Sequence, residues 1–187
     1  DSVKSRGLGD VYKRQEEGSS DLEIISIVCD IFIELELEDS VLKINHLGDK
    51  ETKERFLSEL LKYLKTYKGE LSDNDKEKLN KNPLRILDSK DIDLKEFFSK
   101  GPKIIDFLSS DQLNLLDNIQ SIFGKYVEIE LDSSLVRGLD YYTGLVFEAV
   151  SSNLGAQDSF LGGGRYDELS KDLGGKEMPA ILSLIHI

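Results

Sequence analysis

Residues 127–131 (VEIEL) and 145–150 (LVFEAV) are the segments that decide the fold. The alternation of apolar with polar residues in these segments is typical of strands. Phe160 and Leu161 lead a third predicted strand into a glycine triplet at 162–164. Because short connections join these segments, we expect the strands to form an antiparallel sheet.

Toward the N-terminus, residues 41–46 (VLKINH) also alternate and predict another strand. Residues 20–37 predict a helix that Ser19 or Ser20 caps and that begins with acidic residues. The apolar residues of this helix form no single stripe, which indicates burial on more than one side. Cys29 lies in this apolar run and is expected to be buried.

Residues 48–125 carry no strand signal and predict a helical module rich in acids and lysines. Asn82-Pro83 should end the short charged helix that begins after Ser72, because the residue before a proline avoids the helical region. Helices are expected over residues 48–67, after Ser72, and over 92–98, 104–108 and 109–123. In the last of these, the residues expected to face inward are Leu113, Leu115, Leu116, Ile119 and Ile122.

A final helix is expected over 166–173, ended by glycines. The fold class is α+β, with the module inserted between sheet segments.

Residues 135–144 (LVRGLDYYTG) and 162–167 (GGGRYD) place an arginine, tyrosines and glycines close in sequence. Arg137 offers permanently charged donors that suit a phosphate. The tyrosines offer apolar rings with a hydroxyl at the edge. A glycine loop lets the backbone approach a ligand closely or take positive φ. This set indicates a pocket for a planar polar ligand together with a phosphate.

Each of these residues also has a structural alternative. Arg137 can pair with Asp140, three residues further on. Any one of the tyrosines can be a core aromatic with a bonded hydroxyl, and the glycines can form a plain tight turn. The residues alone leave both interpretations open.

The composition restricts the classes of function. A net charge of −12, from 36 acidic and 24 basic residues, argues against a nonspecific nucleic-acid surface. A local lysine patch would still permit contact with RNA phosphates, although such a run is more often a solvated face. The lysines concerned are Lys62, Lys65, Lys68, Lys76, Lys78 and Lys81.

No metal site is expected, because Cys29 is the only cysteine and His46 the only histidine before the final residues. We expect His46 to be a hydrogen-bonded histidine at a strand end. No apolar run reaches the about 18 residues of a membrane span, and residues 1–15 lack the apolar centre of a signal peptide. The cytoplasm is therefore the expected location, with no membrane partner.

Residues 1–15 (DSVKSRGLGDVYKRQ) and 182–187 (LSLIHI) are similar to peptides obtained by translating sequencing-adapter DNA. We expect both to be non-native tails. The expected organisation is then a helix-and-strand segment over 16–47, the helical module over 48–125 and a second sheet segment over 126–181.

The two motif segments resemble the signature segments of histidyl-tRNA synthetase, a class II aminoacyl-tRNA synthetase. Residues 16–49 resemble the helix and strand that follow the second class-defining motif of that family, and residues 82–91 (NPLRILDSKD) resemble part of its helical insertion. The resemblance runs in order from about residue 16 to 181. It implies part of the family's antiparallel-sheet catalytic domain, with catalytic-domain segments over 16–47 and 126–181 and the helical insertion domain over 48–125.

The resemblance also implies roles for individual residues. Arg137 would be the catalytic and ATP-binding residue, placed against the α-phosphate of ATP and the carboxylate of the amino acid. Tyr142 and Tyr166 would bind histidine, with Tyr141 beside them. Gly162, Gly163 and Gly164 would form the floor under the substrate, whereas Arg165 and Asp167 would support that loop.

The implied function is that of histidine–tRNA ligase, which uses ATP with Mg²⁺ to form histidyl-adenylate and transfers histidine to tRNA(His), normally as a homodimer. The first, second and third class motifs and the anticodon-binding domain would lie outside this sequence. We therefore expect the polypeptide alone to be inactive.

Three alternatives are weighed against this function. The first is the non-catalytic relative that serves as regulatory subunit of ATP phosphoribosyltransferase in histidine biosynthesis. The second is a synthetase-like domain that senses uncharged tRNA in a protein kinase. The third is a plain interaction module around residues 48–125. The intact arginine–tyrosine set favours the synthetase.

Overall fold

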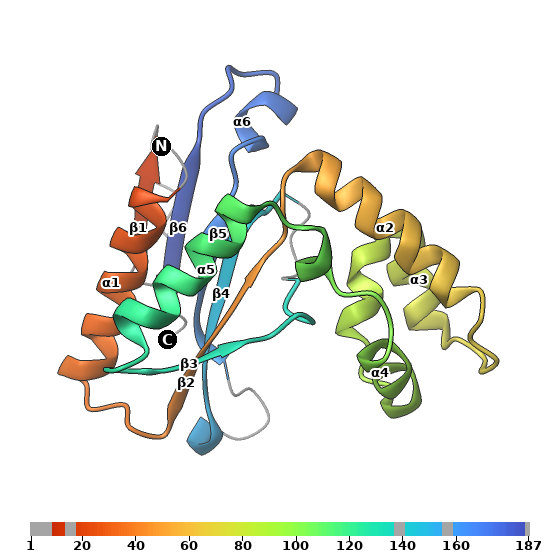
Figure 1. Cartoon of the computed structure of the whole chain (residues 1–187), viewed down its shortest axis with the longest axis horizontal. Coiled ribbons are helices and arrows are strands. Elements are labelled where there is room, and N and C mark those ends of the chain that lie inside the picture. The colour runs from red at the N-terminus through yellow and green to blue at the C-terminus, as the bar shows by residue number, and fades with distance from the viewer. Residues whose placement is uncertain (1–8, 14–17, 137–140, 155–158, 186–187) are drawn as a thin grey trace.

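A mixed sheet lies at the centre of the computed structural model, which describes residues 9–13, 18–136, 141–154 and 159–185 (Figure 1). Within these residues the sheet has six strands in the order β1-β6-β5-β4-β2-β3. The strands are β1 (Gly9–Lys13), β2 (Ser40–His46), β3 (Glu128–Leu131), β4 (Thr143–Ser151), β5 (Ser159–Arg165) and β6 (Ala180–Ile185).

The pairing is antiparallel for β1–β6, β6–β5, β5–β4 and β4–β2, which confirms the predicted antiparallel character. The exception is β3, which pairs with β2 in parallel, with Val41 opposite Glu128. A parallel neighbour needs a long crossover connection. Here the whole helical module supplies that connection, so strand alternation in residues 127–131 alone did not indicate the direction of pairing.

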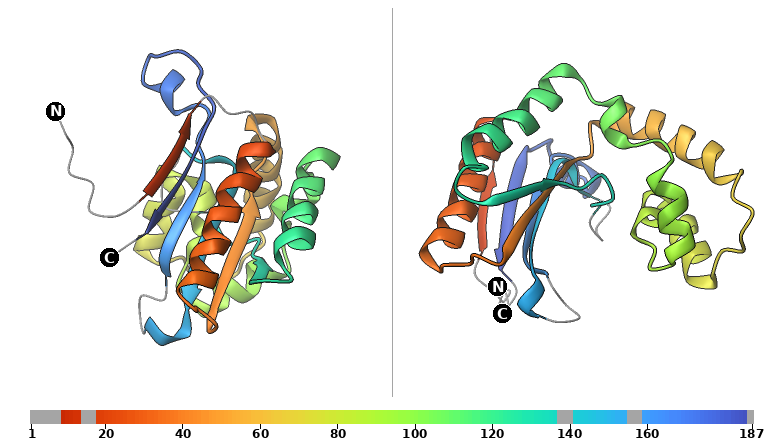
Figure 2. Two further views of the ribbon diagram at one scale, coloured as in Figure 1. Left: turned by 90° about the vertical axis from the view of Figure 1, so that its left-hand side faces the viewer. Right: turned by 60° about the horizontal axis from the view of Figure 1, so that its bottom comes forward.

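Helices and the loops between them form the remaining described parts of the chain. The α-helices are α1 (Ser19–Glu34), α2 (Lys50–Leu64), α3 (Asp73–Lys81), α4 (Ile92–Ser99), α5 (Ser110–Phe123) and α6 (Leu169–Asp172). The 3₁₀ helices are η1 (Pro83–Asp88), η2 (Ile104–Phe107) and η3 (Ser152–Leu154). Helices α1 and α5 cover one face of the sheet, whereas α2, α3 and α4 form a module beside it (Figures 1 and 2).

The core between the sheet and its covering helices is apolar. Cys29 is 3% exposed, as the sequence predicts. The buried members of this core include Ile24, Val28, Leu42, Ile44, Leu116, Ile119, Phe147 and Leu161. Ile122 was expected to face inward, but it is 42% exposed, whereas Phe123, the last residue of α5, packs against this core.

The start of α1 differs from the expected serine cap. Gly18 is the N-cap residue, with φ of 105°, and its N–H donates to Asp21 Oδ2 over 2.6 Å. Ser20 and Asp21 are instead buried, at 1% and 0% exposure. Their side chains are therefore turned toward the protein interior, where the functional site uses them.

The helical module has a second core. Phe56 and Leu60 of α2 pack with Leu94 and Phe98 of α4, and this cluster also includes Tyr142, which immediately precedes β4. Side chains cap two of its helices, because Asp49 accepts from Thr52 N over 2.8 Å and Ser72 accepts from Asp75 N over 3.1 Å. Between β2 and β3 the described residues are helical or irregular, without a strand.

At the other end of the sheet, α6 is shorter than expected. The sequence predicts a helix over 166–173, but α6 spans Leu169–Asp172. Residues before it are held by the strand ladder and by side-chain contacts described below. Gly174, with φ of 83°, follows the helix as predicted for a terminating glycine.

The two segments expected to be non-native meet at one edge of the sheet. β1 pairs with β6 from Gly9 opposite Leu184 to Lys13 opposite Ala180. This pairing concerns how the segments fold, and their origin stays a prediction. Among the described helices, none combines the length and the apolar character that crossing a bilayer requires.

Candidate functional site

Three tyrosines meet at one end of the sheet. Tyr141 and Tyr142 immediately precede β4, and Tyr166 immediately follows β5. β4 and β5 are antiparallel neighbours, with Thr143 opposite Arg165, so these two segments lie at the same end. The ring centroids of Tyr141 and Tyr142 are 4.9 Å apart, and those of Tyr141 and Tyr166 are 6.0 Å apart at 69°.

The environment of these tyrosines suits recognition of a planar ligand. Tyr142 is 3% exposed, whereas Tyr141 and Tyr166 are half-buried. Burial, together with the nearby Tyr142, raises the pKa of Tyr166 above its ordinary value. Tyr166 is therefore a neutral phenol at physiological pH, able to donate or accept a hydrogen bond. Tyr141 joins the cluster because it precedes the strand, where side chains do not yet alternate between faces.

The glycine triplet does not form the expected flexible loop. Residues 162–164 lie inside β5, paired with β4 on one side and β6 on the other. The alternative of a plain tight turn is also wrong. Because strand residues have fixed neighbours on both sides, the reason for glycine must be sought in close packing.

Gly164 lies directly against Tyr142. A Cβ added at Gly164 would be 2.8 Å from Tyr142 Cδ1 and 2.8 Å from the carbonyl oxygen of Leu145. A Cβ at Gly163 would overlap the Phe147 ring and the carbonyl oxygen of Leu182. The glycines thus let aromatic rings lie flat against the strand, and Gly164 fixes the position of one tyrosine of the cluster.

A buried ion pair supports the segment that carries Tyr166. Arg165 is 1% exposed and donates from Nε and Nη2 to the two carboxylate oxygens of Asp21, over 3.0 and 2.6 Å. Arg165 Nη2 also donates to Ser20 Oγ over 2.7 Å, and Nη1 donates to Asp167 Oδ1 over 3.1 Å. Burial alone lowers the pKa of Arg165, but the bonds and charge of Asp21, with Asp167, outweigh burial and raise this pKa.

Asp167 completes the support. Its Oδ1 accepts from Ala180 N over 3.0 Å, and its own N–H donates to Thr143 Oγ1 over 3.1 Å. The Tyr166 N–H donates to the Ala180 carbonyl over 2.8 Å. Arg165 and Asp167 therefore hold the backbone on both sides of Tyr166, in agreement with the supporting role predicted for them.

The junction between β2 and α2 contacts the tyrosines from the other side. Gly48 and Gly144 both have left-handed φ, of 69° and 62°. Leu47 N donates to the Gly144 carbonyl over 2.7 Å, and Gly144 N donates to the Gly48 carbonyl over 3.2 Å. His46 is fully buried, and its Nδ1 accepts from Gly48 N over 3.0 Å. This is the hydrogen-bonded strand-end histidine that the sequence predicts.

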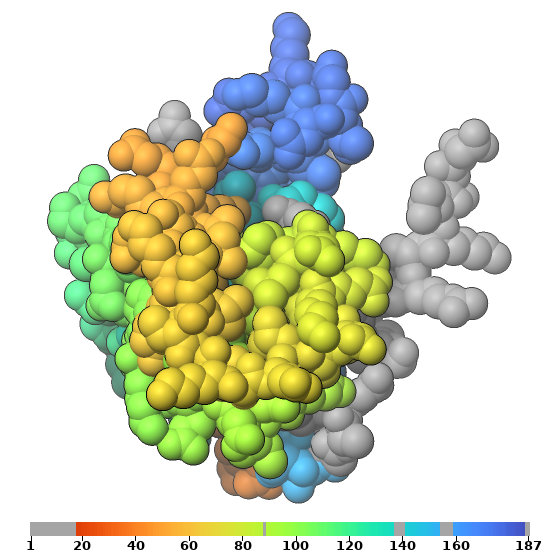
Figure 3. All heavy atoms as spheres, turned by 90° about the vertical axis from the view of Figure 1, so that its right-hand side faces the viewer, coloured from red at the N-terminus to blue at the C-terminus, as the bar shows by residue number. Residues whose placement is uncertain are grey.

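Lys53 of α2 is a site residue that sequence reasoning missed. Its Nζ donates to the carbonyl oxygen of Tyr142. In the sequence it is one of many lysines in a charged helix, so only the fold distinguishes it. In the space-filling view from the module side, α2 (orange) borders the chain near the start of β4 (cyan), with the α6 region above (Figure 3).

Arg137, the predicted catalytic residue, and Asp140, its alternative partner, lie outside the described residues. The chain just before them is anchored, because Leu135 and Val136 are 8% and 7% exposed. Asn45 Nδ2 donates to the Leu135 carbonyl over 3.0 Å. The role of Arg137 therefore stays a prediction.

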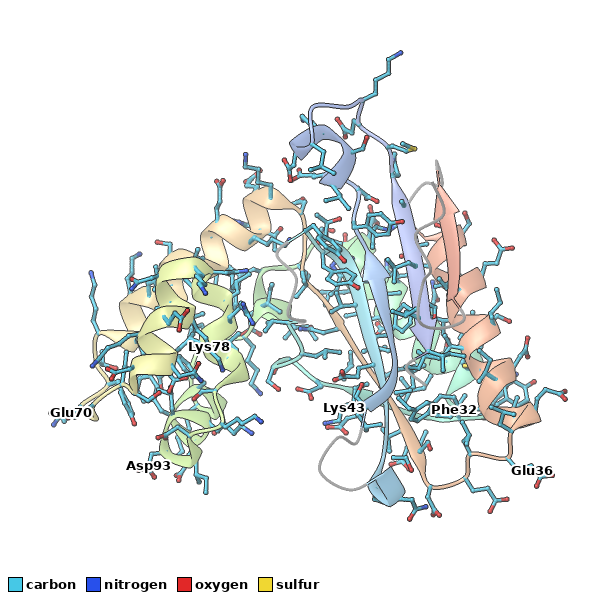
Figure 4. The ribbon with its side chains drawn as sticks, turned by 180° about the vertical axis from the view of Figure 1, so that it is seen from behind. Phe32, Glu36, Lys43, Glu70, Lys78 and Asp93 are labelled. Carbon is cyan, nitrogen blue, oxygen red and sulfur yellow. The ribbon has the colours of Figure 1, made fainter. Side chains whose placement is uncertain are left out.

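Lysines of the module pair with acids on their own helices. Lys62 Nζ lies 2.6 Å from Glu59, Lys81 Nζ lies 2.6 Å from Glu77, and Lys78 Nζ lies 4.0 Å from Asp75. Figure 4 shows Lys78 within the module, together with Glu70 and Asp93, far from Lys43 on β2. The Lys62 and Lys81 pairs are exposed, which is typical of a solvated face, the alternative to RNA contact, whereas the Lys78–Asp75 pair is largely buried.

Two cavities differ in their suitability as the site. One of about 470 Å³ lies between the start of α1 and α5 and is lined by residues such as Leu22, Gln112 and Asn118. Another of about 330 Å³ is lined by Tyr166, Leu169, Met178 and Ala180. We place the candidate site at the tyrosines, because the larger cavity contains neither an aromatic ring nor a cationic side chain.

Sheet, covering helices and inserted module together define part of a class II aminoacyl-tRNA synthetase catalytic domain. The crystal structure of apo histidyl-tRNA synthetase from S. aureus is similar with a TM-score of 0.70 and 27% identity, over 96% of this chain and 44% of that chain. The crystal structure of an ATP phosphoribosyltransferase regulatory subunit/histidyl-tRNA synthetase from Bacillus halodurans is similar with a TM-score of 0.56 and 20% identity. The similarity covers 95% of this chain and 50% of that chain, and at this identity it shows the fold alone.

Sequence comparison identifies the family within this class. The family model described as histidyl-tRNA synthetase matches residues 15–182. The histidine–tRNA ligase of Chlorobium phaeovibrioides is 44% identical over 161 residues, which cover 85% of this chain and 38% of that protein. That of Francisella tularensis subsp. holarctica is 43% identical over 163 residues, 86% and 39% of the two chains.

The chain belongs to the histidyl-tRNA synthetase family, which confirms the resemblance seen in its motifs. It spans 38% and 39% of the length of the two curated relatives named above.

Proposed function

We propose that this chain is part of a histidine–tRNA ligase, which activates histidine with ATP to histidyl-adenylate and transfers it to tRNA(His). The convergence of Tyr141, Tyr142 and Tyr166 at one sheet end is the observation that supports it most directly. Membership of the family supports the proposed reaction. The tyrosine cluster supports the proposed substrate, because it offers a surface that suits the flat, polar side chain of histidine.

In this proposal the tyrosines hold the imidazole of histidine. Their rings offer apolar faces, and their hydroxyls offer hydrogen bonds to the ring nitrogens. Residues 162–164 bring the β5 backbone under the ligand. A site of this kind rejects amino acids that lack the polar ring, because its partly buried hydroxyls would then be left unpaired.

Arg137 would bind the α-phosphate of ATP and the carboxylate of histidine. Its guanidinium would offset the charge that develops on the phosphorus as the carboxylate oxygen attacks it and pyrophosphate leaves. ATP would arrive with Mg²⁺, a cation usually held by substrate phosphates and few carboxylates. Among the described residues, no group of three or more His, Cys, Asp or Glu side chains is arranged to hold a metal.

The remaining partners follow from the same proposal. The complete ligase would act as a homodimer in the cytoplasm and would bind tRNA(His). The 187-residue polypeptide by itself should show no histidine-dependent ATP–pyrophosphate exchange, because the first, second and third class motifs would be supplied by other segments. Measurable turnover by this polypeptide would contradict that expectation.

The test uses a full-length ligase that contains this segment. Histidine-dependent ATP–pyrophosphate exchange, followed by charging of tRNA(His), is the expected result. Tyr166→Phe should raise the KM for histidine on the order of tenfold, since one hydrogen bond to the ligand is lost. Tyr126→Phe is the matched control, because Tyr126 is 63% exposed and lies away from the cluster.

A regulatory subunit of ATP phosphoribosyltransferase is the competing function. The two curated relatives reported above are both named histidine–tRNA ligase, and these names do not favour the regulatory subunit. A full-length protein that stimulates ATP phosphoribosyltransferase but catalyses no exchange would replace the ligase proposal with this one.

A further inference from the structure

The backbone around Tyr142 is tied to the first turn of α2. Two main-chain hydrogen bonds join Leu47 and Gly48 to Gly144. A third bond runs from Lys53 Nζ to the Tyr142 carbonyl. Lys53 is itself fixed in the first turn, where its N–H donates to the Asp49 carbonyl over 2.9 Å. The start of α2 therefore holds the segment from Tyr142 to Gly144 as a unit.

Lys53 satisfies a carbonyl that the sheet leaves unpaired. Tyr142 precedes β4, so its carbonyl lies outside the β4 ladders, which begin with Thr143 and Leu145. A backbone carbonyl beside a buried ring needs a hydrogen-bond partner, and a half-buried ammonium gives a charge-assisted bond. The direction of this bond fixes the peptide plane that follows Tyr142.

The Tyr142 ring is held by the same helix. It belongs to the apolar cluster that contains Phe56 and Leu60 of α2. Gly164 on β5 closes the other side of the ring, since a Cβ there would be 2.8 Å from Tyr142 Cδ1. Both the backbone and the ring of Tyr142 thus depend on where α2 lies.

We propose that Lys53 is a positioning residue that orients Tyr142 for histidine and thereby couples the helical module to the histidine site. The proposal rests on the function proposed above, because it concerns the ligand of the same tyrosines. Lys53 acts through the Tyr142 backbone and not on the reacting atoms. Its loss should therefore weaken histidine binding and leave the handling of ATP unchanged.

The test compares Lys53→Met, Lys53→Arg and Lys62→Met in a full-length ligase that contains this segment. Lys62 is the matched control, since it lies on the same helix and pairs with Glu59 at the surface. We expect Lys53→Met to raise the KM for histidine in ATP–pyrophosphate exchange about tenfold, with kcat and the KM for ATP near wild type. Lys53→Arg, which retains a cationic donor, should restore most of the affinity.

A merely structural lysine would give a different pattern. An unchanged histidine KM in Lys53→Met, or equal losses in the KM values for histidine and ATP, would overturn the proposal. So would a Lys53→Arg variant as impaired as Lys53→Met.

Amide hydrogen exchange separates this inference from the proposed function. The Gly144 N–H, which donates to Gly48, should exchange about tenfold faster in Lys53→Met than in Lys62→Met, whether or not histidine is the substrate. If the wild-type ligase lacks histidine-dependent exchange, the proposed function fails while this measurement still decides on Lys53. Equal Gly144 exchange in both variants would refute the positioning role.

Discussion

Arg165 and Asp21 form a fully buried, bidentate ion pair, although they lie 144 positions apart in the sequence. The pair joins the start of α1 to the end of β5, immediately before Tyr166. Asp21 performs two tasks, because it also accepts from the Gly18 N–H at the N-terminus of α1. The segment around Tyr166, for which histidine binding is proposed, is therefore tied to the start of α1, a helix that covers one face of the sheet (Figure 1).

Replacing Asp21 should be strongly destabilising. Asp21→Asn removes the counter-charge that faces Nε and Nη2 of the buried Arg165 and leaves Asp167 at Nη1; breaking one partner of a buried pair costs about 3–5 kcal/mol. Equilibrium urea unfolding measures this loss. Asp30→Asn on the exposed side of the same helix is the control and should change stability by less than about 0.5 kcal/mol. Similar losses in the two variants would show that the ion pair is not the stabilising element.

Adding a methyl group at Gly164 should disturb both stability and the tyrosine cluster. The added Cβ would lie 2.8 Å from both the Tyr142 ring and the Leu145 carbonyl, so Gly164→Ala should cost about 1–3 kcal/mol through overpacking. In a full-length ligase it should also raise the KM for histidine. Gly174→Ala is the comparison, because Gly174 has positive φ but no atom within 4 Å of its added Cβ. It should introduce backbone strain without changing the histidine KM.

The sequence predicts most of the elements but not all of their partners. Hydrophobic periodicity and capping residues such as Asp49 and Ser72 locate the helices, because these signals are local. The parallel pairing of β3 with β2 is set by the crossover through the module, which strand alternation does not contain. Ile122 was placed inside because its spacing fits the apolar face, yet Ile122 is exposed and its neighbour Phe123 packs against the core.

The candidate site shows the same division. Tyr142 and Tyr166 were recognised from motifs, and β4–β5 pairing brings them together. The glycine triplet was taken for a loop because glycines favour turns, whereas here the need is for close ring packing within a strand. Lys53 and Asp21 act on residues 89 and 144 positions away, so no local pattern distinguishes them from other charged residues.

Cys29 should be an inert thiol in the folded protein. Burial first, and then the charge of Asp30, raises the pKa of Cys29 from 9.0 to about 12. Because the thiolate is the reactive form, iodoacetamide at pH 8 should leave the native protein unmodified and label one site after unfolding in urea. Rapid labelling of the native protein would mean that α1 does not stay packed on the sheet.

The same pKa shift gives a dependence of stability on pH. The folded state binds the Cys29 proton more tightly than the unfolded state, so unfolding releases a proton once the pH exceeds about 9. The contribution of this group to the free energy of unfolding is constant below pH 9 and falls by about 1.4 kcal/mol per pH unit between pH 9 and 12. Urea unfolding at pH 8, 9.5 and 10.5 measures this slope, which Cys29→Ala should remove.

Arg137→Ala should separate catalysis from folding. In a full-length ligase, the variant loses the charge that would stabilise the α-phosphate during adenylate formation, so kcat for ATP–pyrophosphate exchange should fall on the order of a hundredfold or more. The urea midpoint should change little if the arginine serves the substrate, whereas a structural pair with Asp140 would make the variant less stable while exchange persisted. Arg55→Ala is the control, because Arg55 donates to the Phe107 carbonyl at an exposed position. An exchange rate equal to wild type in Arg137→Ala would remove this residue from the catalytic role and leave the tyrosines as a binding surface alone.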